Sequence, residues 1–129
     1  MAIDSLGILR VLIVDDHLVF RQSLKIILLK IKGIHVVGEA ENGLEALHLF
    51  RQLQPDLIIM DVSMPKMGGI EATRFIKAES QETRIIGLSM HDDEYVAQAM
   101  REAGAWACMN KSHSPNQLME TIRGCIQSN

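Results

Sequence analysis

The sequence lacks the features that mark several specialised classes of protein. Its thirteen Lys and Arg residues form no basic run, and the net charge is −3. Neutralising phosphates needs a basic face, so this chain is not expected to bind nucleic acid by itself. The longest apolar stretch of the first helical segment, residues 26–29, is far too short to span a bilayer, and no signal peptide is apparent before Ile8. We therefore expect no membrane contact.

Cysteine is also scarce: Cys108 and Cys125 are the only two, and they lack the CxxC spacing of redox or zinc motifs. This usage is typical of a reducing compartment, so we expect a cytoplasmic protein in which both thiols pack as small apolar groups. A bridge between them is left open but is not favoured. No repeat, low-complexity tract or linker interrupts the 129 residues, which predict a single domain with an ordered core over about residues 8–127.

The chain instead alternates between short apolar runs and helical periodicity. The short runs are rich in Val, Ile and Leu, as expected for strands buried on both faces, and each is followed by apolar residues at helical spacing. Five strands that alternate with five helices predict an α/β fold with a doubly wound parallel sheet. The expected strands cover residues 9–15, 34–40, 56–61, 84–89 and 106–110, and the expected helices cover residues 17–32, 44–53, 69–79, 92–103 and 115–126.

Cap residues support these boundaries. Gly33 and Gly104 stand where the first and fourth helices are expected to end, as C-terminal caps. Asn42, followed three positions later by Glu45, predicts a capping box at the start of the second helix. The pair Ser114-Pro115 supplies an N-cap and a first-turn proline for the last helix.

Polar side chains follow four of the expected strands. Asp15 and Asp16 end the first strand, Asp61 ends the third, Ser89 ends the fourth, and Lys111 follows the fifth. Taken singly, each is better explained as a cap, a turn residue or a solvated strand end. Ligands in open α/β sheets bind outside the carboxyl ends of the strands, however, and the joint pattern therefore predicts one site there.

The residue types at this edge indicate a cation and a phosphoryl group. Three neighbouring carboxylates would raise one another's pKa unless a divalent cation lay among them. An oxygen-only cluster with few ligands suits Mg²⁺, or Mn²⁺, and does not suit Zn²⁺. The hydroxyl of Ser89 and the ammonium of Lys111 suit the oxygens of a phosphoryl group, whose transfer needs mainly positioning and charge neutralisation. The five histidines show no metal-binding spacing, and no zinc site is expected.

In their order and spacing these residues resemble the receiver domain of two-component response regulators, and the resemblance covers essentially the whole chain. It implies a flavodoxin-like sheet with the strand order 2-1-3-4-5. The matching stretches are Val14-Asp15-Asp16-His17, Asp61 with the loop Met64-Pro65-x-Met67-x-Gly69, Leu88-Ser89, and Lys111.

The resemblance also implies a role for each site residue. Asp61 is the expected phosphoacceptor. Asp15, Asp16 and Asp61, together with the backbone carbonyl of Ser63, are the expected ligands of Mg²⁺. Lys111 is expected to pair with one phosphoryl oxygen and Ser89 to donate a hydrogen bond to another, which would draw the loop after Ser89 toward Asp61.

The implied function is a signalling switch that receives a phosphoryl group from a sensor histidine kinase, and not a metabolic enzyme. The stretches Asp16-His17 and 88–94 resemble the LuxR/NarL-type subfamily, whose receivers precede a helix-turn-helix output domain. We therefore expect a transcription regulator that contacts DNA only through an output domain absent from this chain. Homodimer formation, and a stand-alone receiver that acts on a partner protein, are left open.

Two residues depart from the receiver pattern. Cys108 stands where receivers usually have a tyrosine or phenylalanine that reports phosphorylation, and Ser112 replaces a proline that often follows the lysine in a cis bond. These changes leave the phosphoacceptor chemistry intact. They affect how phosphorylation would change the conformation of the rest of the domain. We expect Cys108, with its small volume, to couple the movement of the Ser89 loop only weakly.

Two other functions were weighed against the switch. A phosphatase with an aspartyl nucleophile would place a second acid two residues after Asp61, where the chain has Ser63. A flavin-binding domain of the same topology would need a phosphate loop after the first strand. The chain has Asp15-Asp16-His17 at that point, and the two carboxylates would repel an anionic phosphate.

Overall fold

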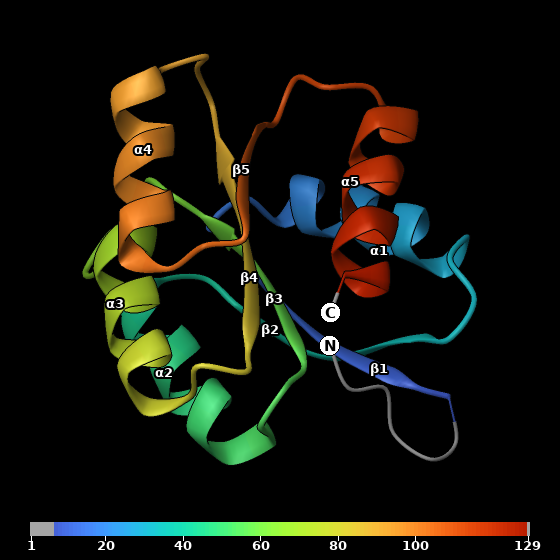
Figure 1. Ribbon diagram of the computed structural model, residues 1–129, viewed down its shortest axis with the longest axis horizontal. Helices are drawn as coiled ribbons and strands as arrows, with labels where there is room; N and C mark the ends of the chain where they lie inside the picture. Colours follow the sequence, from blue (N-terminus) through green and yellow to red (C-terminus); the bar gives the residue numbers. More distant parts are fainter. Residues whose placement is uncertain (1–6, 129) are drawn as a thin grey trace.

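Five parallel strands form a central sheet between two layers of helices in the computed structural model, which describes residues 7–128 (Figure 1). Residues 1–6 and 129 lie outside the described part of the chain. None of the described helices is long and apolar enough to cross a membrane. The elements are β1 (Leu9–Val14), α1 (Leu18–Leu29), β2 (Ile34–Ala40), α2 (Gly43–Leu53), β3 (Leu57–Asp61), α3 (Gly69–Glu79), β4 (Arg84–Ser89), α4 (Glu94–Ala103), β5 (Ala107–Asn110) and α5 (Pro115–Gln127).

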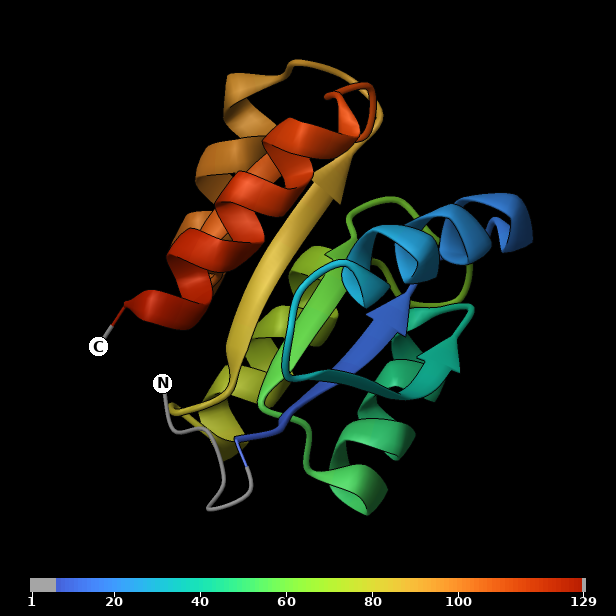
Figure 2. The ribbon, with the colours of Figure 1, turned by 90° about the vertical axis from the view of Figure 1, so that its right-hand side faces the viewer.

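The strand order is β2-β1-β3-β4-β5 and every pairing is parallel, which confirms the predicted doubly wound α/β fold. Helices α1 and α5 cover one face of the sheet, and α2, α3 and α4 cover the other (Figures 1 and 2). The chain reverses its winding direction at β1, so the carboxyl ends of β1 and β3 diverge toward helices on opposite faces. Ligand sites form at such switch points.

Alternate residues of each strand enter two separate hydrophobic cores. Val11 and Ile13 of β1 face the core beneath α1 and α5, whereas Leu12 and Val14 face the core beneath α2 and α3. This separation follows from the two-residue period of a strand. All of β3 is buried, which places Asp61 at the end of a strand with no solvent-facing side.

Several predicted boundaries need correction. The first helix ends at Leu29 instead of Lys32, with Lys30 as its cap, and Gly33 is not its cap. Gly33 instead adopts a φ of +89° in the turn that leads into β2. Ile31 lies in that turn and its side chain is buried, so it extends the apolar pattern of the helix. Periodicity alone cannot distinguish such a residue from one in the helix. The fourth helix begins at Glu94, two residues later than expected, because Asp93 is its N-cap.

The caps of the other helices largely follow the sequence. Asn42 accepts a hydrogen bond from the backbone N–H of Glu45, as predicted. Among the described helices the reciprocal capping box is recorded at Ser114 and Gln117, not at Asn42.

The loop after β3 folds back tightly on the strand end. The backbone N–H of Gly69 donates to the carbonyl oxygen of Val62 at 2.9 Å. A Cβ atom on Gly69 would stand 2.1 Å from the carbonyl oxygen of Asp61, closer than any side chain tolerates. A glycine is therefore required here, and it brings α3 against the end of β3.

Candidate metal and phosphoryl site

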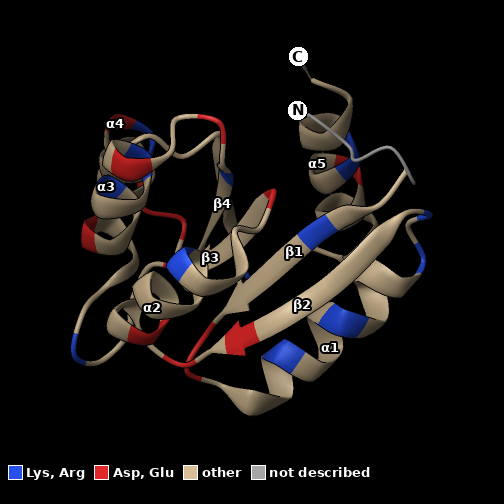
Figure 3. Ribbon diagram, turned by 90° about the horizontal axis from the view of Figure 1, so that it is seen from below, with Lys and Arg blue, Asp and Glu red and all other residues tan. Residues whose placement is uncertain are grey.

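The predicted acidic residues meet at the carboxyl edge of the sheet. Val14 pairs with Met60 in the register of β1 and β3, so the residues that follow, Asp15 and Asp61, end side by side. Asp15, Asp16, His17 and Asp61 each offer a ligand atom, and these atoms all lie within 4.8 Å of one another. Figure 3 shows acidic residues gathered where β1 and β2 end.

Lys111 supplies the positive charge that faces this cluster. Its Nζ lies 2.5 Å from Oδ2 of Asp15 and 3.2 Å from Oδ2 of Asp61. The ring of Phe20, on α1, lies with its centroid 4.7 Å from the same Nζ. The cation is therefore held between two carboxylates and an aromatic face, at a position where its side chain is only 7% exposed.

The two buried carboxylates are short of compensating groups. Neither Oδ2 of Asp15 nor Oδ2 of Asp61 accepts a hydrogen bond of regular geometry, although both lie within ion-pair distance of Lys111. Burial and the charge of Asp15 raise the pKa of Asp61 to about 6, and Lys111 only partly opposes them. An anionic Asp61 is therefore costly unless further positive charge enters the site.

Backbone contacts hold the first acid in place. The buried Arg21 of α1 donates from Nη1 to the carbonyl oxygen of Asp15 at 2.6 Å, and from Nε to Oε1 of Glu39 on β2 at 2.9 Å. The backbone N–H of His17 donates to Oδ1 of Asp15 at 2.8 Å. The backbone of Asp15 is thus held by α1, and its carboxylate is oriented by the backbone of His17.

The two serines lie at the expected edge, but neither hydroxyl is recorded in contact with the acids. The backbone N–H of Ser63 donates to Oδ1 of Asp61 at 3.3 Å. Ser89 pairs with Asn110 at the end of β4, and its hydroxyl donates to the carbonyl oxygen of His91 at 2.9 Å. In this state the Ser89 hydroxyl is therefore engaged within its own loop.

This donor set fits a hard divalent cation. The buried Oδ2 atoms of Asp15 and Asp61 accept no hydrogen bond of regular geometry and share the single ammonium of Lys111, and Asp16 adds a more exposed carboxylate. Carboxylate oxygens are the ligands that Mg²⁺ prefers, and Mg²⁺ keeps several waters when few protein ligands are present. Asp15, Asp16 and Asp61 would hold such an ion, which would supply the missing positive charge.

Comparison with known proteins identifies the family. The model of the response regulator receiver domain matches residues 11–123. The chain belongs to the response regulator receiver domain family. This confirms the resemblance on which the predicted roles depend.

Several relatives of this receiver are longer proteins that are named as regulators. It is 40% identical to the transcriptional regulatory protein YdfI of Bacillus subtilis over 93% of this chain and 56% of that protein. It is 39% identical to the response regulator UvrY of Escherichia coli over 89% of this chain and 53% of that protein. The receiver thus spans about half the length of these relatives.

Solved structures of response regulators have the same fold as this chain. A two-component response regulator of the LuxR family from Aurantimonas superposes with a TM-score of 0.87 at 35% identity, over 92% of this chain and 85% of that one. The response regulator domain of Thermotoga maritima CheB superposes with a TM-score of 0.85 at 33% identity, over 95% and 98% of the two chains.

The two departures from the receiver pattern lie beside the site. Cys108 on β5 is half-buried and, with Ser89, Asn110 and His113, lines a cavity of about 110 Å³ between the loops after β4 and β5. Burial raises the pKa of the Cys108 thiol, which therefore stays protonated and behaves as a small apolar group. No cis peptide bond occurs in the described chain, so Lys111 and Ser112 are joined by a trans bond.

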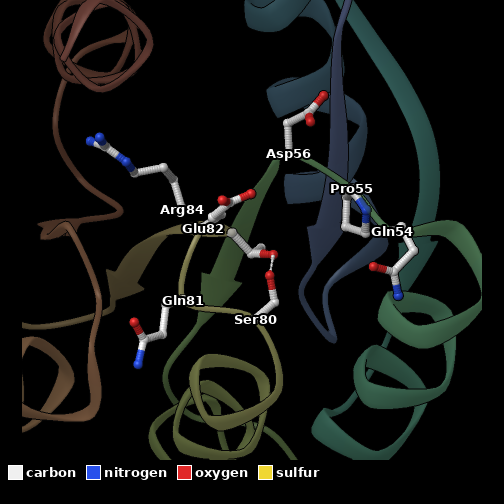
Figure 4. Close-up of a pocket in the computed structure, with 8 residues that line it drawn as sticks. Gln54, Pro55, Asp56, Ser80, Gln81, Glu82 and Arg84 are labelled. Carbon is white, nitrogen blue, oxygen red and sulfur yellow. Dashed lines mark hydrogen bonds between the residues drawn. The ribbon is translucent and has the colours of Figure 1, made fainter. Parts of the chain in front are cut away.

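A larger cavity than the one beside Cys108 lies at the opposite edge of the sheet. It has a volume of about 440 Å³ and is formed by the segments that precede β3 and β4 (Figure 4). Asp56, Glu82 and Arg84 are its charged residues, and the hydroxyls of Ser80 and Thr83 bond to each other across 2.8 Å. The predicted site residues do not line it.

The sequence predicts no site role for three residues that lie at the site: His17, Phe20 and Arg21. His17 directly follows the acid pair, and that adjacency was a usable signal. Phe20 and Arg21 looked like ordinary residues of an amphipathic helix, because their partners Lys111 and Glu39 come from distant segments. Only the fold brings those groups together.

Proposed function

We propose that this receiver accepts a phosphoryl group on Asp61 from the phosphohistidine of a sensor histidine kinase. The observation that carries the proposal is the ammonium of Lys111 placed between the buried carboxylates of Asp15 and Asp61. Such an arrangement has too much negative charge to be explained as a structural ion pair, and it suits the binding of a cation together with a phosphoryl group.

In the transfer, a carboxylate oxygen of Asp61 forms a bond to phosphorus while the bond from phosphorus to the donor's imidazole nitrogen breaks. The imidazole leaves with that electron pair. Lys111 neutralises charge on the phosphoryl oxygens, and the hydroxyl of Ser89 donates to one of them after leaving the carbonyl of His91. Mg²⁺, held by Asp15, Asp16 and Asp61, would supply further charge neutralisation.

The switch follows from the state-dependent contact of Ser89. Only a contact that differs between two states can shift their equilibrium, and a phosphoryl group on Asp61 offers Ser89 a partner that the carboxylate lacks. The loop after β4 then moves, and α4 and β5 respond. Cys108, beside a cavity of about 110 Å³, lets the loop move without displacing a large side chain.

Intact-mass analysis after incubation with acetyl phosphate and Mg²⁺ tests the proposal. The wild-type receiver should gain one phosphoryl group, and the gain should require the metal. Asp61→Asn should abolish it, whereas Asp56→Asn, an acid at the opposite edge of the sheet, should not. Equal labelling of the wild type and Asp61→Asn would exclude Asp61 as the acceptor.

We further propose that the receiver regulates transcription in the cytoplasm as part of a longer protein. Support comes from the relatives, two of which are named transcriptional regulatory proteins, and from the fact that the receiver spans about half their length. DNA contact is assigned to an output domain, because this chain carries a net charge of −3 and no basic run. A gel-shift assay with the complete gene product, with and without phosphorylation, tests this. The isolated receiver should show no specific DNA binding.

A further inference from the structure

We propose that His17 gives the acidic cluster a nitrogen ligand, so that it binds borderline divalent cations such as Co²⁺, Ni²⁺ and Zn²⁺ in addition to Mg²⁺. The inference rests on the proposed metal site and adds a residue that selects among metals. The sequence predicted an oxygen-only cluster, and the structure places an imidazole in it.

The distances around His17 match those of a coordination sphere. Nδ1 of His17 lies 3.1 Å from Oδ1 of Asp16 and 3.3 Å from Oδ1 of Asp15. Ligand atoms held about 2.1 Å from a six-coordinate ion are about 3.0 Å apart along each edge of the octahedron. The imidazole and the two carboxylates therefore stand at the spacing of adjacent ligands before any ion arrives.

The backbone of His17 is held in place, whereas its side chain does not cap the helix that follows. Its N–H donates to Oδ1 of Asp15 at 2.8 Å, which locks the residue beside the acid. His17 occupies the N-cap of α1, yet its side chain makes no capping hydrogen bond. The side chain is 61% exposed, so solvent and ions reach the imidazole freely.

The buried acids give independent support for a cation at this point. Oδ2 of Asp15 and Oδ2 of Asp61 belong to residues that are about 1% exposed, accept no hydrogen bond of regular geometry and share one ammonium, that of Lys111, so negative charge exceeds positive charge here. Within the described part of the chain, His17 is the only histidine that joins a group of ligand atoms of this kind.

A nitrogen ligand should favour some divalent metals over others, because metals differ in the ligands they prefer. Mg²⁺ prefers oxygen ligands, so it gains little from an imidazole. Co²⁺, Ni²⁺ and Zn²⁺ bind imidazole well; among divalent first-row metals, affinity for such sites rises from Mn²⁺ through Co²⁺ and Ni²⁺ to Cu²⁺ and falls again at Zn²⁺. Occupancy by such an ion would engage Asp61 and compete with the Mg²⁺ that phosphorylation uses.

Titration calorimetry with MgCl₂ and with CoCl₂ on the wild type and His17→Asn tests the inference. Asn is a good N-cap, so this variant should keep α1 intact. We expect Co²⁺ affinity to fall at least tenfold and Mg²⁺ affinity to change less than threefold. The proton spectrum of the Co²⁺ form should contain paramagnetically shifted imidazole signals, which should vanish in His17→Asn. His48→Asn, an exposed histidine outside the cluster, serves as the matched control and should change neither affinity.

The outcomes separate this inference from the proposed function. Equal Co²⁺ affinity in the wild type and His17→Asn, with Mg²⁺ binding and Asp61 phosphorylation intact, would overturn the role of His17 alone. If Asp16→Asn leaves the binding of both metals unchanged, the proposed metal site itself is wrong.

Discussion

The two ends of the strands hold charged groups in different ways. At the amino ends, near the larger cavity, Lys77 and Asp56 are half-buried and have hydrogen-bond partners within the chain. Nζ of Lys77 donates to the carbonyl oxygens of Gln81 and Thr83 at 2.5 and 2.9 Å. Oδ2 of Asp56 accepts the backbone N–H of Arg10 at 2.8 Å. Lys77 thus stabilises the turn that follows its helix, and Asp56 ties the start of β3 to β1.

At the carboxyl edge, two buried carboxylates share a single ammonium, and a third acid stands beside them. The pKa of Asp61 is raised by this crowding. The two ends therefore differ in charge balance: the candidate site holds more negative than positive charge, and the amino end does not show this excess among the groups named above. The size of a cavity does not reveal this, because the larger cavity lies at the balanced edge.

The largest effect should come from removing the shared cation. Lys111→Met leaves two buried carboxylates without compensation, so the free energy of unfolding should fall by about 3 kcal/mol at neutral pH without metal. Phosphorylation should slow by about 100-fold, as for the loss of a group that stabilises developing charge. Urea denaturation and time-resolved mass analysis measure the two effects.

Lys77→Met is the matched control at the amino edge. It removes two hydrogen bonds to turn carbonyls, which should cost about 1 kcal/mol, and it should leave the phosphorylation rate unchanged. Equal effects of the two substitutions on phosphorylation would remove the distinction between the edges.

A smaller effect should come from neutralising Asp61, and the size of its effect on stability should depend on pH. The folded-state pKa of Asp61, about 6, lies above the ordinary value of 3.8, so the folded protein binds a proton more tightly than the unfolded chain. The stability of the wild type relative to Asp61→Asn should therefore fall as the pH rises from about 4 to about 6 and then level off. At pH 7 without metal, Asp61→Asn should be more stable by about 2 kcal/mol.

Denaturation of both proteins across this pH range gives the difference in their free energies of unfolding. The contributions of the other acids are common to both proteins and largely cancel in that difference. Asp56→Asn serves as the matched control at the opposite edge, because the amide oxygen of asparagine can still accept the backbone N–H of Arg10. A difference curve for Asp61→Asn that is flat with pH would contradict the raised pKa.

The smallest effect on the unphosphorylated protein should come from Ser89→Ala. The hydroxyl bonds only within its own loop, so the free energy of unfolding should change by less than about 1 kcal/mol. Amide exchange in residues 89–111 should slow when beryllofluoride is added to the wild type, and that response should shrink in Ser89→Ala. An undiminished response would assign the switch to another contact.

Much of the fold could be predicted because its signals are local. Strands β2 and β4 have the predicted limits, since glycine or polar residues bound a short apolar run. The limits of α1 could not be predicted, because Ile31 is buried by a turn that mimics another turn of helix. The acids, Ser89 and Lys111 were visible as polar residues at strand ends.

The remaining parts of the site depend on contacts between segments far apart in the chain. Nothing in the sequence of α1 reveals that Phe20 covers the ammonium of Lys111, or that Arg21 is buried against Asp15 and Glu39. The excess of negative charge at Asp15 and Asp61 also depends on their burial beside a single ammonium, and the sequence alone does not show which residues are buried together.

The close approach of Gly69 to the carbonyl oxygen of Asp61 has a consequence for the evolution of this domain. Even the methyl group of alanine would stand 2.1 Å from that oxygen, so position 69 excludes substitutions by size alone. A mutational library should therefore show two different kinds of intolerance only eight residues apart. Position 61 should reject residues that lack a carboxylate, with asparagine giving a folded but inactive protein. Position 69 should reject every side chain, and no change of polarity or charge should rescue it.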